Sequence, residues 1–340
     1  MAVANYAQQN WPNGSANPQY LALKEVLDTA PAYECINDAC DERTVQKQMG
    51  ANINLRRYFT PAVDATPAPE GVQKEPRSLL FEDFVGTMLR YTERFQVTRV
   101  DYDLNPYNAV AAAQDRLRQL ILSTRERVRW NAAITFANVI YNSTAVSAIN
   151  QVNGPIQPGR LQVIIRAIRN AKGEVFDQIA PGVNKEGTSP TEACYNVYSH
   201  TDLEPDWRAF PDFSTVAETP SGKPKSLCHF GNWQNACVYT TPEALILLGA
   251  GAASTTMKNT AGVADVYPVI VTARHALTSV KLAGGGKEGF GNLNIKVLDE
   301  ADKADPNNDW VDIVASWYDL CMVTSNDWGY VWYVAATLNP

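Results

Sequence analysis

The spacing of hydrophobic and polar positions changes several times along the chain, and each period predicts a different element. Residues 51–103 hold two runs in which apolar and polar side chains alternate, INLRRYF from Ile53 and FEDFVGTMLRYTERFQVTRV from Phe81. The proline-rich connector TPAVDATPAPEGVQKEPR lies between them, so the pattern predicts a long two-stranded excursion. Such a hairpin exposes backbone edges, which would aggregate in a lone monomer but pair with neighbours in an assembly.

The next segment has a helical period. Asn105 and Pro106 supply an N-cap followed by a proline, and apolar residues then recur every three to four positions to about Tyr141. At about 1.5 Å per residue this helix would be on the order of 50 Å long, which is long for a globular protein. A second amphipathic helix is predicted from Pro158 to Ala171.

The rest of the chain mixes strands, turns and short helices. Residues 1–50 are polar and punctuated by Pro and Asn, with a short helical pattern only at Leu21–Leu27. Residues 174–300 alternate short strands with Pro/Gly turns, and short helices are predicted around Thr241–Leu248 and Tyr267–Leu277. The C-terminal run DWVDIVASWYDLCMVTSNDWGYVWYVAAT predicts two strands that return to the core. The fold class is therefore α+β.

Composition and charge narrow the range of functions that the chain could have. The 340 residues include 36 Asp and Glu against 29 Lys and Arg, and the net charge of −7 argues against indiscriminate capture of nucleic acid. No apolar run reaches the roughly 18 residues of a membrane span, and the first residues lack the pattern of a signal peptide. We therefore expect no membrane partner and a cytosolic protein, in which the six cysteines are reduced thiols.

The sequence lacks the common motifs that carry catalysis or bind metals. The three histidines form no HExxH motif, and there is no GxSxG elbow. Cys228, His229 and Cys237 lack the CxxC spacing of a zinc site. The glycine-rich run GGGKEGFG lacks the Ser/Thr of a phosphate loop, and the acidic run from Asp305 lacks the glycine of a calcium loop. We expect no enzyme activity, no metal and no cofactor.

Five arginines flank the apolar stripe of the long helix. Their guanidinium groups could contact DNA phosphates, pair with carboxylates of a neighbouring subunit, or lie along the helix surface in solvent. Because the whole chain is acidic, the intersubunit and solvated roles are favoured. These DNA-facing or intersubunit candidates are Arg116, Arg118, Arg125, Arg127 and Arg129.

Several stretches, taken in order, resemble the major capsid proteins of tailed bacteriophages, in particular the branch typified by short-tailed phages that carry a large virion RNA polymerase. The matching order, which covers roughly residues 50–335, carries more weight than any one motif. The stretches are PAPEGVQKEP from Pro67, RERVRWNAAITFANVIY from Arg125, YSHTDLEPDWR from Tyr198, KSLCHFGNWQNACVYTTPEAL from Lys225 and ADPNNDWVDIVASWYDLCMVTSNDW from Ala304.

The resemblance implies the coat fold shared by tailed phages and herpesviruses. Its parts would be an N-terminal arm at 1–50, an extended β-hairpin loop at 51–103, a peripheral domain with a long spine helix at 104–180, an axial α/β domain at 181–298, and C-terminal strands at 299–340. The expected contacts between subunits in the loop are Arg56, Arg57, Glu70 and Gly71.

The function implied is a shell subunit. It would self-assemble as a homo-oligomer of hexamers and pentamers into an icosahedral virion capsid that encloses double-stranded DNA, built in the host cytoplasm. Scaffolding, portal and decoration proteins are further partners that this role implies. Two alternatives stay open: the shell of a cellular nanocompartment, which uses the same fold, and a surface ligand-binding module whose Trp and Tyr side chains contact a carbohydrate.

Overall fold

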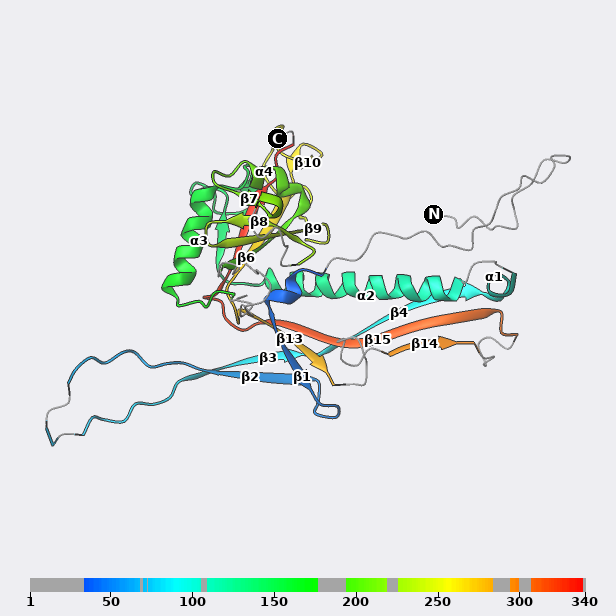
Figure 1. Cartoon of the computed structure of the whole chain (residues 1–340), viewed down its shortest axis with the longest axis horizontal. Helices are drawn as coiled ribbons and strands as arrows, with labels where there is room; N and C mark the ends of the chain where they lie inside the picture. Colours follow the sequence, from blue (N-terminus) through cyan, green and yellow to red (C-terminus); the bar gives the residue numbers. More distant parts are fainter. Residues whose placement is uncertain are drawn as a thin grey trace, which may run out of the picture.

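The computed structural model describes residues 34–67, 70–71, 73–104, 109–176, 194–218, 226–283, 294–299 and 307–338. One β-sheet lies along a long helix, a second lies at the end of that helix, and a hairpin projects from the body in the opposite direction (Figure 1). The short elements are η2 (Ile36–Ala39), α1 (Arg99–Leu104), η3 (Ile149–Gln151), η4 (Thr201–Leu203), η5 (Val216–Glu218), β10 (Asn259–Thr260) and β11 (Val263–Ala264).

The elongated sheet is built around one long strand, β15. On one edge β15 pairs antiparallel with β4 over ten residues, and on the other edge it pairs first with β14 and then with β13. Strand β1 adds to β13 in parallel. The strands of this sheet are β1 (Cys40–Val45), β4 (Leu89–Thr98), β13 (Leu277–Leu282), β14 (Asn294–Leu298) and β15 (Trp310–Val323).

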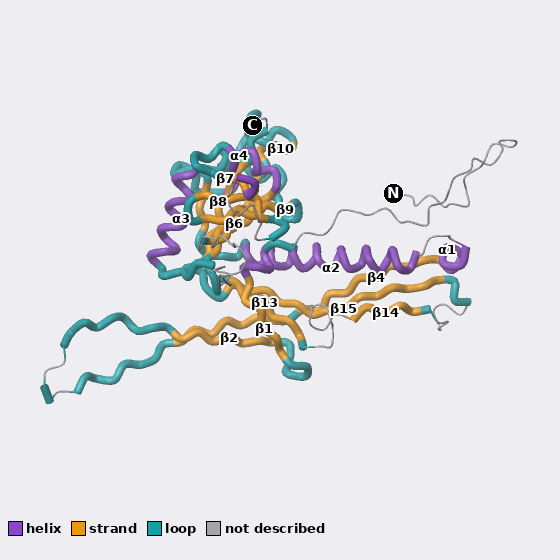
Figure 2. Tube along the Cα trace, viewed as in Figure 1, coloured by secondary structure: helices purple, strands orange, loops and turns teal. Residues whose placement is uncertain are grey.

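Helix α2 (Ala109–Ala133) lies along this sheet (Figure 2). Leu117 and Ile121 on the helix are almost fully buried, and they pack against Ile313 and Trp317 of β15. The alternation along β15 buries every second side chain beneath the helix, which is the pattern expected of a strand with one covered face. The apolar stripe of the long helix therefore packs on β15, the longest of the described strands.

The second sheet has seven strands in the order β5-β16-β12-β6-β9-β8-β7. Its central strands are buried on both faces, because helix α3 (Pro158–Asn170) and α4 (Glu204–Arg208) cover one face and the end of α2 with η2 covers the other. The strands are β5 (Val139–Tyr141), β6 (Tyr195–His200), β7 (Ser214–Thr215), β8 (His229–Trp233), β9 (Ala236–Thr241), β12 (Val266–Thr272) and β16 (Gly329–Ala335).

The predicted hairpin is present over part of its length, because Leu89–Thr98 of the second run form β4 and pair with β15 in the elongated sheet. Strands β2 (Asn52–Tyr58) and β3 (Phe81–Thr87) pair antiparallel in continuous register from Asn52 opposite Thr87 to Tyr58 opposite Phe81. Beyond them residues 59–67 and 73–80 continue outward without forming a strand, as Figure 1 shows. The second amphipathic helix and the two C-terminal strands are likewise confirmed by α3, β15 and β16.

Three predicted helical segments differ from the structure. The long helix ends at Ala133 and not near Tyr141, because Val139–Tyr141 form β5 and pair in parallel with β16. The helix predicted at Tyr267–Leu277 is the buried strand β12 followed by a turn at His275, whose φ is 64°. Residues 241–248 likewise form the end of β9 and turns rather than a helix. The N-cap at Asn105 and the pattern at Leu21–Leu27 lie outside the described residues.

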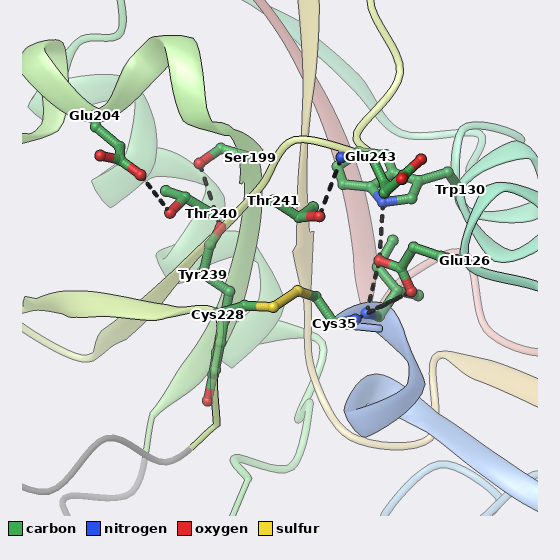
Figure 3. The surroundings of a disulfide bond; sticks show 11 residues. Cys35, Glu126, Trp130, Ser199, Glu204, Cys228, Tyr239, Thr240, Thr241 and Glu243 are labelled. Carbon is green, nitrogen blue, oxygen red and sulfur yellow. Dashed lines mark hydrogen bonds between the residues drawn. A yellow bond between two sulfur atoms is a disulfide. The ribbon is translucent and has the colours of Figure 1, made fainter. Parts of the chain in front are cut away.

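The expectation of reduced cysteines is wrong for four of the six. Cys35 forms a disulfide with Cys228, across 193 positions of sequence, and Cys194 forms one with Cys237. Figure 3 shows the first bond joining the segment before η2 to the start of β8. Because Cys35 and Ile36 are fully buried, this part of the predicted N-terminal arm belongs to the folded body. The domain limits themselves remain predictions.

The long-range disulfide should contribute strongly to stability. A crosslink that closes a loop of this length restricts the unfolded chain by about 5 kcal/mol in the chain-entropy model. We expect the Cys35→Ser/Cys228→Ser double variant to unfold at lower denaturant concentration than the wild type. Reductant should lower the wild-type midpoint more than that of the variant, which lacks this bond. Unfolding followed by tryptophan fluorescence tests this. A wild-type midpoint that equals that of the variant under oxidising conditions would contradict it.

Candidate functional site

The hairpin presents one face to solvent and the other to the body. On the outward face, Arg56 makes two hydrogen bonds to Asp83, at 2.7 and 2.8 Å, and its guanidinium carbon lies 4.1 Å from the ring centroid of Phe81. Phe81 meets Tyr58 edge-to-face, and Val85 on the same face is 70% exposed. A surface that combines aromatic rings, an aliphatic side chain and an ordered arginine is the composition typical of protein–protein contacts.

Farther out, charged side chains join the two extended segments. Asp64 accepts hydrogen bonds from the backbone amide of Thr66 and from the Lys74 ammonium, at 2.9 and 3.1 Å, and its carboxylate lies 3.2 Å from the Arg77 guanidinium. The hydrogen bond from the Thr66 amide, followed by the other donors, holds the pKa of Asp64 below its ordinary value. Apolar side chains around this group stay exposed, among them Val63, Leu79 and Leu80.

Arg57, the neighbour of Arg56, faces the opposite way. Its guanidinium stacks 4.7 Å from the Trp328 ring and donates a hydrogen bond of 3.3 Å to the carbonyl of His275. Burial lowers the pKa of Arg57. Arg56 and Arg57 were both predicted as contacts between subunits. The structure places them on opposite faces, so that only Arg56 lies on the outward surface.

A cavity of about 450 Å³ opens where the hairpin leaves the body. The His275 ring lies between two carboxylates, 2.5 Å from Asp41 and 3.5 Å from Glu174. Thr324 donates a hydrogen bond of 3.0 Å to the His275 carbonyl, which also accepts from Arg57. We call this cavity the root pocket; it is lined by Asp41, Arg43, Leu55, Arg56, Arg57, Phe84, His275, Thr278, Thr324 and Trp328.

Glu70 and Gly71 lie at the far end of the hairpin, away from the root pocket. Both are exposed and form a turn. Gly71 has a φ of 79°, a backbone conformation that residues with a side chain rarely adopt. Among the described residues, Glu70 has no hydrogen bond or ion pair with its own subunit. The four predicted hairpin contacts therefore occupy three places: the outward face, the root pocket and the tip.

The five spine-helix arginines divide into two groups. Arg116, Arg118 and Arg127 lie on the surface, where Arg116 donates to Gln119 at 3.1 Å and Arg118 lies 3.5 Å from Asp115. The Arg127 side chain is 56% exposed and lies 3.8 Å from Glu243. These three keep the predicted role of contacting DNA or another subunit as a proposal.

Arg125 and Arg129 are inside the subunit, with 5% and 0% of their surfaces exposed. Both pair with Glu34, and Arg125 also lies 3.6 Å from Asp319 of β15. Because the body of the subunit covers them, neither can reach a phosphate or a neighbouring chain in this conformation. For these two residues the prediction is corrected: they join the helix to the elongated sheet and to the segment before η2.

Glu126, between these arginines, anchors the same segment. Its carboxylate accepts hydrogen bonds from the backbone amides of Cys35 and Ile36, at 3.1 and 3.2 Å, and from the indole of Trp130 at 3.2 Å (Figure 3). Burial raises the pKa of Glu126 to about 7, although the two amides and Arg129 oppose the shift. The disulfide at Cys35 lies next to this contact, so one short segment is held both covalently and by hydrogen bonds.

Sequence reasoning missed Glu34, Glu126 and Asp319 as members of this cluster. Glu126 and Trp130 stand four residues apart on one helix face, which was a usable local signal. Nothing local pointed to the backbone amides of the segment before η2, which are 90 and 91 positions away from Glu126. The disulfides also exclude the zinc site that was weighed at Cys228 and Cys237, because both thiols are consumed.

Two further classes of feature are not found in the described part of the chain. No group of three or more His, Cys, Asp or Glu side chains there is arranged to hold a metal ion. None of the described helices combines the length and apolar character needed to cross a bilayer.

No model of a protein family matches the chain, and a search of curated proteins finds no match. Solved structures do match it over nearly the full length. The capsid of Ralstonia phage GP4 has 10% identity and a TM-score of 0.71, with 97% of this chain and 98% of that chain covered. The cyanophage Pam1 capsid has 9% identity and a TM-score of 0.63, covering 98% and 100%. An encapsulin complex from Synechococcus elongatus has 10% identity and a TM-score of 0.53, covering 91% of each.

The chain therefore has the phage capsid fold. The predicted α+β class is confirmed, with a projecting hairpin, a long helix on an elongated sheet and a separate central sheet. At about 10% identity, however, the similarity carries the arrangement of elements and not the identity of contact residues.

The buried arginines should contribute to stability and the exposed ones should not. Removing Arg129 leaves Glu34 with only its longer contact to Arg125, at 3.6 Å, and breaking a buried pair in this way costs about 3–5 kcal/mol. We expect Arg129→Ala to lower the free energy of unfolding by that order. Arg127→Ala, two residues away on the same helix, should change it by less than about 0.5 kcal/mol. Denaturant titration of both variants measures the difference, and equal effects would show that Arg129 is not structural.

Glu126 should make stability depend on pH. Its pKa is about 7 in the folded chain, against an ordinary value of 4.5, so the folded chain binds the proton more tightly. The stabilising contribution is therefore complete below pH 4.5 and is lost as pH rises through about 7. We expect the Glu126→Gln variant, which stays neutral, to lose less stability over this interval than the wild type.

Melting temperatures measured between about pH 4.5 and 7.5 compare the two, with Glu82→Gln on the exposed hairpin as the control. The Glu82→Gln curve should run parallel to the wild type. If the Glu126→Gln curve is also parallel to the wild type, Glu126 does not titrate as described.

Proposed function

We propose that this chain is the major capsid protein of a tailed bacteriophage. The observation that carries the proposal is the hairpin, which projects from a folded body and exposes Tyr58, Phe81 and Val85 on a face that no other described part of the subunit covers. An exposed apolar face of this kind is unfavourable in an isolated subunit and becomes favourable when a second subunit covers it. The full-length similarity to phage capsid structures supports the same conclusion.

In this proposal the subunits form hexamers and pentamers, and these close into an icosahedral shell around double-stranded DNA. The virion is the location, with assembly in the host cytoplasm. Arg56 and the exposed side chains of the hairpin contact the neighbouring subunit, and Glu70 and Gly71 contact it at the tip. Arg116, Arg118 and Arg127 of the spine helix contact DNA or another subunit. Scaffolding, portal and decoration proteins are the accessory partners of such a shell.

The role is structural and not enzymatic, and it uses no cofactor. DNA would be held by enclosure, since the net charge of −7 disfavours adhesion of the genome to the protein. The assignment to the branch with a large virion RNA polymerase rests on sequence motifs alone, and we retain it as part of the proposal.

A nanocompartment shell is the second candidate, because an encapsulin complex also matches this fold. The two shells differ in their contents, which are nucleic acid in a virus and protein in a compartment. A surface ligand-binding module is the least supported reading, since it gives no reason for the projecting hairpin.

Assembly of the purified full-length chain tests the proposal. We expect light scattering to detect particles far larger than a 37.4 kDa monomer, and negative-stain microscopy to show closed shells or rings of five and six subunits. Particles from infected or expressing cells should contain nuclease-protected DNA. A protein cargo in place of DNA would favour the nanocompartment. A chain that stays monomeric at high concentration would overturn both kinds of shell.

A further inference from the structure

The outward face of helix α3 carries positive charge. The leucine and isoleucine side chains of α3 are buried against the seven-stranded sheet. With 3.6 residues per turn, the opposite face holds four exposed polar side chains, and Arg160 lies at its edge. Figure 1 shows α3 on the flank of the body that faces away from α2. We call this surface the basic face of α3; it is formed by Arg160, Gln162, Arg166, Arg169 and Asn170.

The sequence around α3 contains no acidic residue. Residues 127–173 include six Lys or Arg and no Asp or Glu, although the whole chain has a net charge of −7. Four of these six, from Arg160 to Lys172, lie on α3 or directly after it. The next acid along the chain, Glu174, lies 3.4 Å from Arg274 and 3.5 Å from His275. Positive charge is therefore concentrated at one place on an acidic subunit, where it attracts anions.

Exposed arginines elsewhere on the subunit commonly have a carboxylate partner. Arg94 lies 2.6 Å from Asp312, and Arg118 lies 3.5 Å from Asp115 on the same helix. The arginines of the basic face differ, because none of them forms an ion pair with a carboxylate in the part of the chain that the structure describes. Their charge is balanced only by ions or molecules outside the described chain.

The composition of the basic face fits phosphate groups better than a protein surface. Protein–protein interfaces have an apolar core, but the one large apolar side chain that the structure describes as exposed on α3 is Val163, at 37%. Arg, Asn and Gln side chains are donors that proteins use to contact DNA phosphates. From Arg160 to Arg169 the helix rises about 14 Å, a length over which duplex DNA carries about eight charges.

We infer that the basic face of α3 binds the phosphate backbone of the duplex DNA inside the shell. The inference rests on the proposed function, which supplies the DNA, and it places α3 on the inner side of the shell. Contacts to phosphates carry no sequence information, so the site accepts any packaged sequence. The acidic net charge of the chain confines adhesion to this face, and the rest of the genome is held by enclosure.

The salt dependence of DNA binding tests the site. The Arg166→Gln/Arg169→Gln variant removes two charges from the basic face and keeps good helix formers there. Arg90→Gln/Arg94→Gln, on the exposed surface of β4, is the matched control, because it removes the same charge elsewhere. Circular dichroism verifies that both variants are folded, and light scattering verifies that they and the wild type have the same size during the measurement.

Fluorescence anisotropy of a labelled duplex of about 20 base pairs, between about 50 and 200 mM salt, gives the slope of log affinity against log salt concentration. Each phosphate contact contributes about −0.9 to this slope. We expect the slope of the Arg166→Gln/Arg169→Gln variant to be less steep than that of the wild type by about two, and the slope of the control to be unchanged. Equal slopes for the two variants would overturn the inference.

Chemical modification of arginines distinguishes DNA from a neighbouring subunit. Phenylglyoxal is added to DNA-filled particles and to empty particles assembled without DNA, and mass spectrometry locates the modified residues. We expect Arg166 and Arg169 to lose reactivity in the filled particles alone, while Arg90 reacts equally in both. Protection in both kinds of particle would assign the basic face to a contact between copies and overturn the inference.

The same experiment separates this inference from the proposed function. Filled particles in which Arg166 and Arg169 stay reactive would overturn the DNA contact and leave the shell function intact. A chain that forms no particles would overturn the proposed function.

Discussion

The end of helix α2 is the point on which the rest of the molecule depends. Along most of its length the helix packs on β15 of the elongated sheet, and at its last turns Trp130 enters the core beneath the seven-stranded sheet. Arg125 and Arg129 pair there with Glu34, and Glu126 holds the backbone before η2. Charges buried this deeply are tolerated only when each finds a partner, so the two sheets and the N-terminal segment must all be in place together. The Cys35–Cys228 bond adds a covalent tie across the same junction.

The body of the subunit, held together at this junction, also packs against the inner end of the hairpin. Ile53, Val280 and Met88 form a small buried cluster under β2 and β3, and Arg57 stacks on Trp328 at the same level. Farther out, however, the apolar side chains stay exposed on the subunit. The inner half of the hairpin is therefore stabilised by packing on its own chain, while the outer half is joined by the surface contacts of Asp64 and leaves its apolar side chains exposed. That division is the physical reason for placing the function in assembly.

The sequence predicted those elements whose signal is local. Alternation predicted β2, β3 and β4, and the helical period predicted α2 and α3. It failed where distant pairing decides the outcome: the helical pattern continues to Tyr141, but β16 captures Val139–Tyr141 as a parallel strand. The run at Tyr267–Leu277 is apolar throughout because β12 is covered on both faces, and such a run has no period that distinguishes a strand from a helix.

The same limit applies to the prediction of site residues. Arginines along a helix stripe can be listed from the sequence, but only the fold places Arg129 under Glu34 and leaves Arg127 in solvent. The cysteine prediction rested on the cellular compartment, which says nothing about distances in the fold. The fold brings the Cα atoms of Cys35 and Cys228 to 6.1 Å, a separation that suits a disulfide.

The outer part of the hairpin joins its two extended segments through charged side chains and not through apolar packing. Interdigitated apolar side chains have little tolerance for changes of angle, because small gaps forfeit much of their attraction. The ion pairs of Asp64 with Lys74 and Arg77 can persist through small rotations, since the lysine and arginine side chains have several rotatable bonds. Segments 59–67 and 73–80 lie outside any strand and contain Pro61, Pro67 and Pro76, so they can remain extended while their direction adjusts. The hairpin thus combines a root fixed by packing with outer segments whose direction can adjust.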